Sequence, residues 1–395
     1  MASTILTDLK ITRAALAILH QKLNFIGSIN RQYDDSFAKE GAKIGSSLKI
    51  RMPNEYTVTT GKTLDVQDTV ETNQTLTVAT QKGIHTTFSS AELSLSLQDF
   101  SDRILEPAMT RLASAIEADV MTAALDVRNA VFGSTASYSD VLAGRVLMQR
   151  GLAPLNDRTA NLTSQDMADV VDGTKALFND QTQIGKQYKE GFMGRAAGYD
   201  FMENTLWPNF TTGAEDGAYV CNTSTGITSG TATIAVTAGT GAIVVGDVFT
   251  VAGVFSVHPE TKVSTGVLQQ FVATAASAGG SVSIAVSPTP VTSGATQNVT
   301  IVSAGASKAV TFAGTLSTAY TTSLLYQKDA FTFVTADLPL PQGVDMARRV
   351  MSDGISLRLV RDYDINNDMF PTRIECLYGF KTLRPDFATR LHYTV

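Results

Sequence analysis

The feature that most constrains the fold is a long central stretch of the chain that carries almost no charge. Within residues 217–327 the charged side chains are Asp247, Glu260, Lys262 and Lys308 alone, and runs of Ala, Gly, Ser, Thr and Val fill the rest. On both sides of this stretch, charges recur every few residues in patterns of mixed helix and strand. We therefore expect an all-β domain, residues 217–327, inserted into an α+β host.

Six short segments inside this stretch alternate apolar with small polar residues, as half-buried strands do. Gly, Pro, Ser and Thr turn signals separate them, which is the pattern of a small barrel or sandwich. The segments are TATIAVTAG, DVFTVAGV, LQQFVATAA, SVSIAVSP, QNVTIVSA and AVTFAG.

The composition narrows the class of protein. A length of 395 residues suggests two or three domains. The net charge of -6 argues against a dedicated nucleic-acid binder, but not against a shell that encloses nucleic acid without gripping it. Cys221 and Cys376 lie far apart and predict neither a disulfide framework nor a metal motif, so a reducing compartment is the default.

Neither a signal peptide nor a membrane span is expected. Lys10 and Arg13 interrupt the apolar residues near the N-terminus. No window reaches the roughly 18 uninterrupted apolar residues that a membrane helix needs.

The N-terminal region predicts a helix over residues 8–26, with Asp8 as its N-cap and Gly27 as its stop. Its leucines recur at intervals close to a helical turn, which makes one face apolar. Two interpretations stay open. The helix docks Leu16, Leu19 and Leu23 on a neighbouring subunit, or it packs on its own domain.

Residues 47–88 read as a long β excursion. The run SLKIRMP alternates apolar with basic residues and stops at Pro53, Gly61-Lys62 gives a turn signal, and IHTTFS leads out as a further strand. Few large apolar residues lie between Tyr56 and Gln81. Because such a hairpin is marginally stable alone, it should either lie on its own body or reach onto another chain.

Residues 89–132 predict one long amphipathic helix of about 25 residues, close to 40 Å, with Pro107 in its first turn. The SSAEL run would cap its start. Shorter helices are expected over residues 137–149 and after Thr163, and a strand and loop over residues 196–213. Strands are expected in FTFVTADLPLP, ISLRLVRDYD and PTRIECLYGFKTLRP, the last two antiparallel with Leu357, Leu359, Ile374 and Leu377 inward.

The sequence offers no catalytic, cofactor or metal site. The histidines are His20, His85, His258 and His392, and they lack metal-ligand spacing. The run from Asp362 to Asp368 resembles the start of a calcium loop but lacks its glycine and its final glutamate, so a polar turn is favoured.

Three other sets of residues have a functional and a structural interpretation. Trp207 beside Pro208 is a recognition aromatic or, more commonly, a loop anchor. For Arg348 and Arg349, a solvated helix face or a salt bridge between subunits is favoured over contact with a polyanion. An enzyme would need convergent carboxylates; the candidates Glu106, Glu117 and Asp119 fit a solvated helix face better.

Several segments, in this order, resemble phage major capsid proteins of the P22 coat-protein type, a branch of the HK97 fold. They are SSLKIRMPNEYTVTTGKTLDVQDTVETNQTLTV, VATQKGIHTTFSSAELSLSLQDFSDRILEPAMTRLASAIEADV, AAGYDFMENTLWPNFTTG, GDVFTVAGVFSVHPETK and RIECLYGFKTLRPDFATRL. Their order and spacing carry the resemblance more than any single motif does.

The resemblance implies an α+β, HK97-like capsid fold with a domain map. It divides the chain into an N-terminal arm (1–46), the E-loop with flanking peripheral-domain (P-domain) strands (47–88), the P-domain with its spine helix (89–133), the axial domain or A-domain (134–216), the inserted β-barrel-like domain (217–327), and the return to the A-domain and the C-terminal P-domain strands (328–395). Candidate contacts between subunits are Leu16, Leu19, Leu23, Gly61, Lys62, Asp65, Asp68 and Trp207.

The implied function is a coat protein that self-assembles as pentamers and hexamers into an icosahedral-type shell around a phage dsDNA genome. Its expected partners are copies of itself, a scaffolding protein and a portal, with no membrane and no sequence-specific DNA binding. Assembly would take place in the cytoplasm of the bacterial host. The alternative is another virion component, a tail-tube or decoration protein, which the Thr- and Gly-rich stretch alone would suit.

Overall fold

The computed structural model describes residues 8–34, 46–58, 60–62, 64, 66–68, 71–89, 105–174, 194–216, 218–352, 355–367 and 369–395. The fold is mixed α/β and mostly sheet. It divides into two compact units. Unit 1 comprises Met1–Arg51, Asn73–Met121 and Phe331–Leu383, and unit 2 comprises Met52–Thr72, Thr122–Ala330 and Arg384–Val395.

Unit 1 is built on a sheet whose central strand is β21 (Met369–Thr382). It pairs antiparallel with β18 (Phe331–Ala336), β20 (Ile355–Arg361) and β4 (Thr80–Ser89). The edges are β19 (Met346–Ser352), antiparallel to β20, and β1 (Asn30–Asp34), parallel to β18. The predicted antiparallel C-terminal strands are confirmed, and Leu357, Leu359, Ile374 and Leu377 are all buried.

The helices of unit 1 differ from prediction in their limits. Residues 8–26 form two helices, α1 (Asp8–Lys22) and α2 (Phe25–Ser28), so Gly27 lies inside a helix and is not a stop. The long helix α5 (Glu106–Met121) has 16 residues instead of about 25, and a 3-10 turn, η3 (Thr122–Asp126), follows it. The apolar repeat continues into η3, where Ala123 and Ala124 are buried, which is why the pattern overestimated the helix. Pro107 does fall in the first turn; SSAEL lies outside the described residues.

A two-stranded hairpin, β2 (Ser46–Arg51) and β3 (Asn73–Val78), pairs antiparallel in unit 1. Its apolar side chains pack on the sheet in a cluster that contains Leu48, Ile50, Leu76, Val78, Val334, Ala336, Leu338 and Leu377. The predicted strands at SLKIRMP and IHTTFS are therefore confirmed. The described residues between Met52 and Thr72 form no strand, so the β pattern expected from Tyr56 onward is limited to β3.

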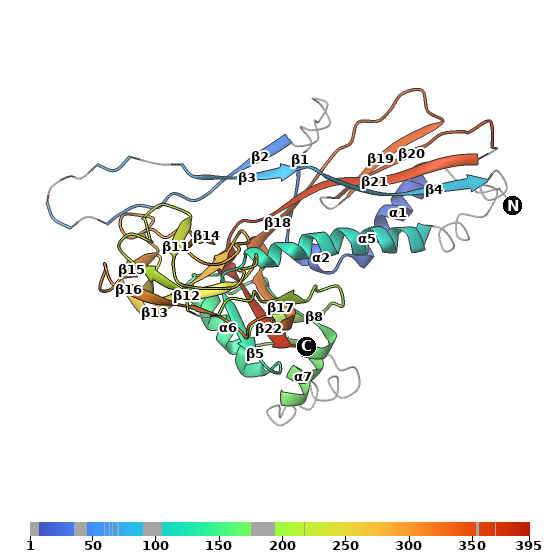
Figure 1. Ribbon diagram of the computed structural model, residues 1–395. Coiled ribbons are helices and arrows are strands. Elements are labelled where there is room, and N and C mark those ends of the chain that lie inside the picture. The colour runs from blue at the N-terminus through green and yellow to red at the C-terminus, as the bar shows by residue number, and fades with distance from the viewer. Residues whose placement is uncertain are drawn as a thin grey trace. The chain divides into compact units, whose positions relative to one another are not determined.

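The α/β part of unit 2 is a sheet of strand order β5-β22-β17-β6-β8-β7, with β9 also on β17. Figure 1 labels β5, β22, β17 and β8 among these strands. The strands are β5 (Ala130–Gly133), β6 (Arg158–Leu162), β7 (Arg195–Ala196), β8 (Tyr199–Glu203), β9 (Phe210–Thr211), β17 (Ala319–Gln327) and β22 (Ala388–Thr394). Helices α6 (Tyr138–Arg150) and α7 (Ser164–Thr174) begin where predicted, because the hydroxyls of Ser137 and Thr163 accept the backbone N–H of Asp140 and Asp166.

Residues 220–312, here called the β-only segment, form strands joined by loops and turns, and no helix occurs among them in the described chain. They are β10 (Val220–Asn222), β11 (Thr233–Val236), β12 (Val248–Val257), β13 (Ser264–Ala273), β14 (Val282–Ser287), β15 (Val299–Ile301) and β16 (Ser307–Phe312). All six predicted segments contain a strand. In the order of the sheet, β10 is the first strand and β11 is the last. A bridge between Val220 and Thr237 brings these two outer strands together. A separate apolar core includes Tyr219, Phe249 and Phe271.

The strands of unit 1 decide between the alternative interpretations of two polar features, the arginine pair and the stretch after Asp362. Arg348 and Arg349 lie on β19 and not on a helix, and the Arg349 guanidinium pairs with Asp337 at 3.2 Å within the chain. The stretch after Asp362 is a turn in which the Asp364 carboxylate accepts the N–H of Asn366 and the side-chain amide of Asn367. The polar-turn interpretation of this near-motif is confirmed.

Candidate functional site

The most unusual surface of the described chain belongs to residues 52–72, here called the arm. Its two limbs are joined at the base by a bond from Met52 N–H to Thr72 O (2.9 Å). Further out, the Gln67 side-chain amide accepts the Thr57 N–H (2.8 Å) and donates to the Thr57 carbonyl (2.5 Å). This pairing replaces the ladder of a strand, so the limbs stay together without forming a sheet.

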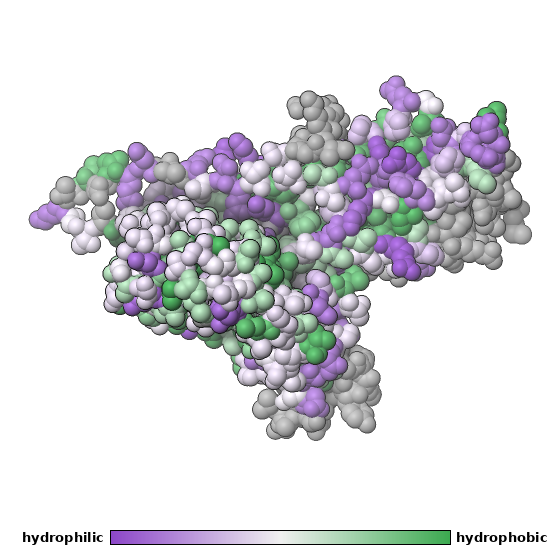
Figure 2. All heavy atoms as spheres, viewed as in Figure 1, coloured by the Kyte–Doolittle hydropathy of each residue, from purple (hydrophilic) through white to green (hydrophobic). Residues whose placement is uncertain are grey.

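The arm exposes large apolar side chains (Figure 2). Val58 is 91% exposed, Leu64 is 86% exposed and Val66 is 78% exposed, and Tyr56 is also exposed. Single exposed apolar residues are ordinary, but several on one short, strand-free segment mark a surface that another molecule covers. The structure therefore points to the arm as a contact element.

Two of the predicted contact residues on the arm, Gly61 and Lys62, lie near its tip. Gly61 has a φ of +131°, a conformation that favours glycine, and it is exposed together with Lys62. Asp68 is exposed as well, whereas Asp65 lies outside the described residues. The turn signal at Gly61-Lys62 therefore placed the tip correctly.

One ion pair joins the arm to the β-only segment within unit 2. Glu55 Oε2 lies 3.1 Å from Lys262 Nζ, and Lys262 also donates to the Gln297 carbonyl. The Glu55 side chain is half exposed, so this pair contributes little to stability.

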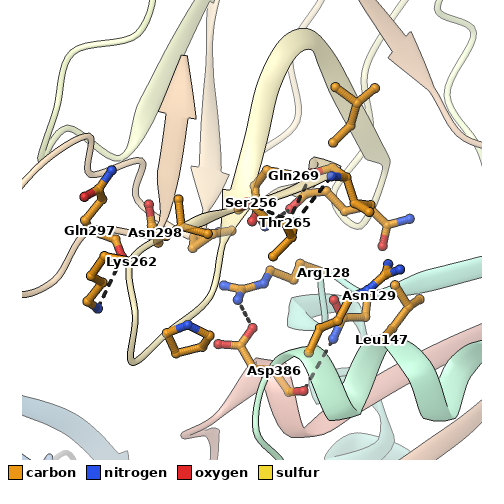
Figure 3. Close-up of a pocket in the computed structure, with 18 of the residues that line it drawn as sticks. Arg128, Asn129, Leu147, Ser256, Lys262, Thr265, Gln269, Gln297, Asn298 and Asp386 are labelled. Carbon is orange, nitrogen blue, oxygen red and sulfur yellow. Dashed lines mark hydrogen bonds and ion pairs between the residues drawn. The ribbon is translucent and has the colours of Figure 1, made fainter. Parts of the chain in front are cut away.

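Beside this ion pair lies a polar cavity of about 330 Å³ (Figure 3). Its lining comes from the β-only segment (Lys262, Gln297) and from residues just before β5 and β22 of the α/β sheet (Arg128, Asp386). Arg128 and Asp386 form an ion pair, and burial lowers the pKa of Arg128 to about 10. The lining contains no histidine, cysteine or tyrosine.

The other predicted contact residues are buried within their own units. Leu16, Leu19 and Leu23 lie in the core of unit 1, where α1 packs on α5 and β19. This is what the alternative interpretation of the N-terminal helix predicts, and an intersubunit contact at these leucines stays a prediction. Trp207 is 7% exposed, and its indole N–H donates to Asn161 Oδ1 (2.8 Å), the geometry of a loop anchor.

The three carboxylates considered for an enzyme do not converge. Glu106 is exposed in the first turn of α5. Glu117 is 1% exposed, which corrects its expected place on a solvated face: its carboxylate accepts the backbone N–H groups of Asn24 and Phe25 and so holds the start of α2. Asp119 accepts the Tyr378 hydroxyl and pairs with Lys82, both at 2.6 Å.

Sequence reasoning missed the role of Glu117, although a signal was available. The buried residues of α5 include Ala113 and Val120, four residues before and three after position 117. Glu117 therefore falls on the apolar stripe, and a carboxylate there must be paired.

Within the described ranges, no cluster of three or more His, Cys, Asp or Glu side chains could hold a metal ion. No helix in those ranges is long and apolar enough to cross a membrane.

The family comparison identifies the chain. The model of the P22 coat protein, gene protein 5, matches residues 28–390. The protein is thus a coat protein, that is, a structural protein of a bacteriophage. The chain belongs to the P22 coat protein family, and it is a major capsid protein that forms the shell.

Solved structures similar to the chain come from several viruses. They include Mycobacterium phage Che8 (11% identity, 93% of this chain and 90% of that one, TM-score 0.47) and the mature capsid of bacteriophage PhiM1 (12%, 94% and 87%, 0.47). The capsid of Cyanophage P-SCSP1u is also similar (9%, 93% and 86%, 0.46). No curated protein sequence matches the chain significantly.

Proposed function

We propose that copies of this chain assemble as pentamers and hexamers into an icosahedral-type shell that encloses a phage dsDNA genome. The observation that carries the proposal is the match to the coat-protein family over residues 28–390. The exposed apolar side chains of the arm support it, because a coat protein buries such surface against its own copies.

The proposed architecture is the HK97-like fold of this family. Unit 1, with its long helix α5 and the sheet around β21, corresponds to the P-domain. The arm is the E-loop and lies across a neighbouring copy. The α/β sheet of unit 2 corresponds to the A-domain, and the β-only segment to the inserted domain on the outer surface. The apolar core of that segment supports its assignment as a domain.

The proposed partners follow from the same assignment. Copies of the chain meet a scaffolding protein during assembly in the host cytoplasm, and a portal occupies one vertex. The net charge of -6 supports enclosure of DNA without tight binding, since an acidic protein has little attraction for the phosphate backbone. The protein has a structural role and no catalytic one.

Expression of the chain with and without its scaffolding protein tests the proposal. Negative-stain electron microscopy of the product should show closed polyhedral shells in at least one condition. Open tubes would favour a tail-tube protein, and monomers that bind only to preformed shells would favour a decoration protein. Either result would overturn the proposal.

A further inference from the structure

The chain enters and leaves the β-only segment through a narrow double connection. Residues 212–216 lead out from β9 and residues 313–318 lead back into β17; together they are called the neck. Thr212 N–H donates to Thr318 O (3.1 Å), and Ser317 N–H donates to Gly213 O (2.9 Å). Ala214 N–H then donates to Ala242 O (2.9 Å) inside the β-only segment. The neck is thus bonded to itself and to the segment that it carries.

Asp247 holds the neck against the loop that precedes β12. One oxygen of its carboxylate accepts the Gly213 N–H (3.2 Å), and the other accepts the Val244 N–H (2.7 Å). Asp247 is 2% exposed. Next to it, Arg390 of β22 donates to the Gly246 carbonyl (2.8 Å), which joins the α/β sheet to the same loop.

Glu215 lies in the neck beside this clamp and has no comparable partner. It is 1% exposed, and no group among the described residues makes a hydrogen bond with its Oε2 atom. A methyl group on Gly213 would come within 3.0 Å of both Glu215 Oε2 and Asp247 Oδ2. The two carboxylates therefore flank one point of the neck, where both side chains are buried.

We propose that the Glu215–Asp247 carboxylate pair is a proton-controlled latch, which holds the neck closed while Glu215 is protonated and loosens it when Glu215 ionises. A buried carboxylate without a partner is costly in its charged form, and a second carboxylate beside it adds repulsion. Opening of the neck lets Glu215 reach water, which relieves both costs. The proposal does not depend on the assembly function.

The charged and titratable groups around Glu215 support this assignment. Desolvation raises the pKa of Glu215 to about 7, its own backbone N–H opposes the shift, and the Asp247 charge adds to it. Asp216 on the neck is exposed and bonded to Thr240, so it stays ionised, and its pKa is lowered. The Tyr219 hydroxyl, whose pKa is raised, donates to Gly241 and leaves the glutamate unpaired.

The remaining cation near the latch is Arg390 on β22. It is 0% exposed, and the charges of Asp247 and Asp126 only partly oppose the effect of this burial on its pKa. Burial lowers the pKa of Arg390 to about 10, so it stays charged near neutrality. The charge of Asp247 acts on Arg390, whereas Arg390 does not contribute to the pKa shift of Glu215.

The sign of the pH effect follows from the raised pKa. The closed neck binds the Glu215 proton more tightly than the open neck, where the carboxyl has its ordinary pKa of 4.5. Closure is therefore favoured fully below pH 4.5, and that advantage is lost as the pH rises through about 7. Between pH 6 and pH 8.5 the opening equilibrium should increase about tenfold.

Hydrogen-exchange mass spectrometry of the full chain tests this, with exchange rates corrected for the intrinsic effect of pH. In the wild type, peptides that cover the neck should lose protection about tenfold between pH 6 and pH 8.5. E215Q, which keeps the shape and removes the charge, should show no such loss. The matched control is E260Q, which removes an exposed carboxylate of the same segment and should behave as the wild type.

A second measurement needs no variant that could misfold. Infrared spectroscopy of the wild type should show the carbonyl stretch of a protonated carboxyl group that disappears with a midpoint near pH 7. A wild-type neck with protection that does not change with pH would overturn the proposal. So would an E215Q profile equal to that of the wild type, or a spectrum with no carboxyl group that titrates near neutrality.

Discussion

Removal of the apolar surface of the arm should block assembly and leave the fold intact. The variant carries V58S, L64S and V66S, three changes at side chains that are 91%, 86% and 78% exposed. Because these side chains contact little of their own chain, the free energy of unfolding of the unassembled protein should change by less than about 0.5 kcal/mol.

The magnitude follows from the area that a neighbouring copy would cover. Burial of one Val or Leu side chain contributes at least about 1.5 kcal/mol. Scaled by the exposed fractions, the three residues contribute about 4 kcal/mol for each arm. A loss of this size weakens one arm contact about a thousandfold. The concentration needed for assembly should rise far beyond that of the wild type.

Light scattering against protein concentration measures this threshold, and electron microscopy confirms the product. The matched control replaces two exposed arm residues, T57S and T60S, which keeps the polarity and removes little apolar area. Circular dichroism of unassembled protein checks the fold of both variants. Wild-type assembly by the triple-serine variant would refute the claim that the arm buries its apolar side chains on another copy.

Three further predictions concern stability, each measured by thermal or denaturant unfolding. E117A should cost about 3 kcal/mol, because two backbone N–H groups at the start of α2 lose a charged acceptor; E106A, at an exposed position of the same helix, should be near neutral. G379A should cost about 2 kcal/mol or more, because its methyl group would come within 3.0 Å of the Thr77 carbonyl of β3; a wild-type stability would disprove this close approach. H392F should remove acid sensitivity: burial holds the pKa of His392 well below 6.5, so its contribution is present above pH 6.5 and lost as the pH falls through that lowered pKa. An unchanged acid limb in this variant would show that another group is responsible.

The β-only segment was predictable because its signal is local. Alternation, glycine turns and the absence of charge all indicate short strands, and each predicted segment contains one, including those that contain Phe249 and Phe271. The N-caps gave similar local information, as at Ser137. Where residues only a few positions apart determine the structure, as Ser137 and Asp140 do at the start of α6, the structure could be predicted from the sequence.

Elements fixed by distant partners were not predictable in the same way. Strand β22 (Ala388–Thr394) is buried at nearly every position between β17 and β5, so it shows no alternation. The division between α1 and α2 depends on Glu117, more than 90 positions away. The arm shows the opposite case: Thr- and Val-rich composition favoured strands there, but the described residues have no partner strand in the chain.

Some of the few charged side chains of the β-only segment connect it to other parts of unit 2, and these connections become visible only in the folded structure. Asp247 binds the neck at Gly213, and Lys262 pairs with Glu55 of the arm. Two of its four charged side chains thus lie where the segment meets other parts of unit 2, while the core behind them is apolar. We expect a charged side chain in such a charge-poor stretch to make a specific contact, because a charge that serves only solubility can lie anywhere on the surface. The sequence shows that charged residues are few in this segment. It does not show the partners of Asp247 and Lys262, which lie 34 and 207 positions away in the chain.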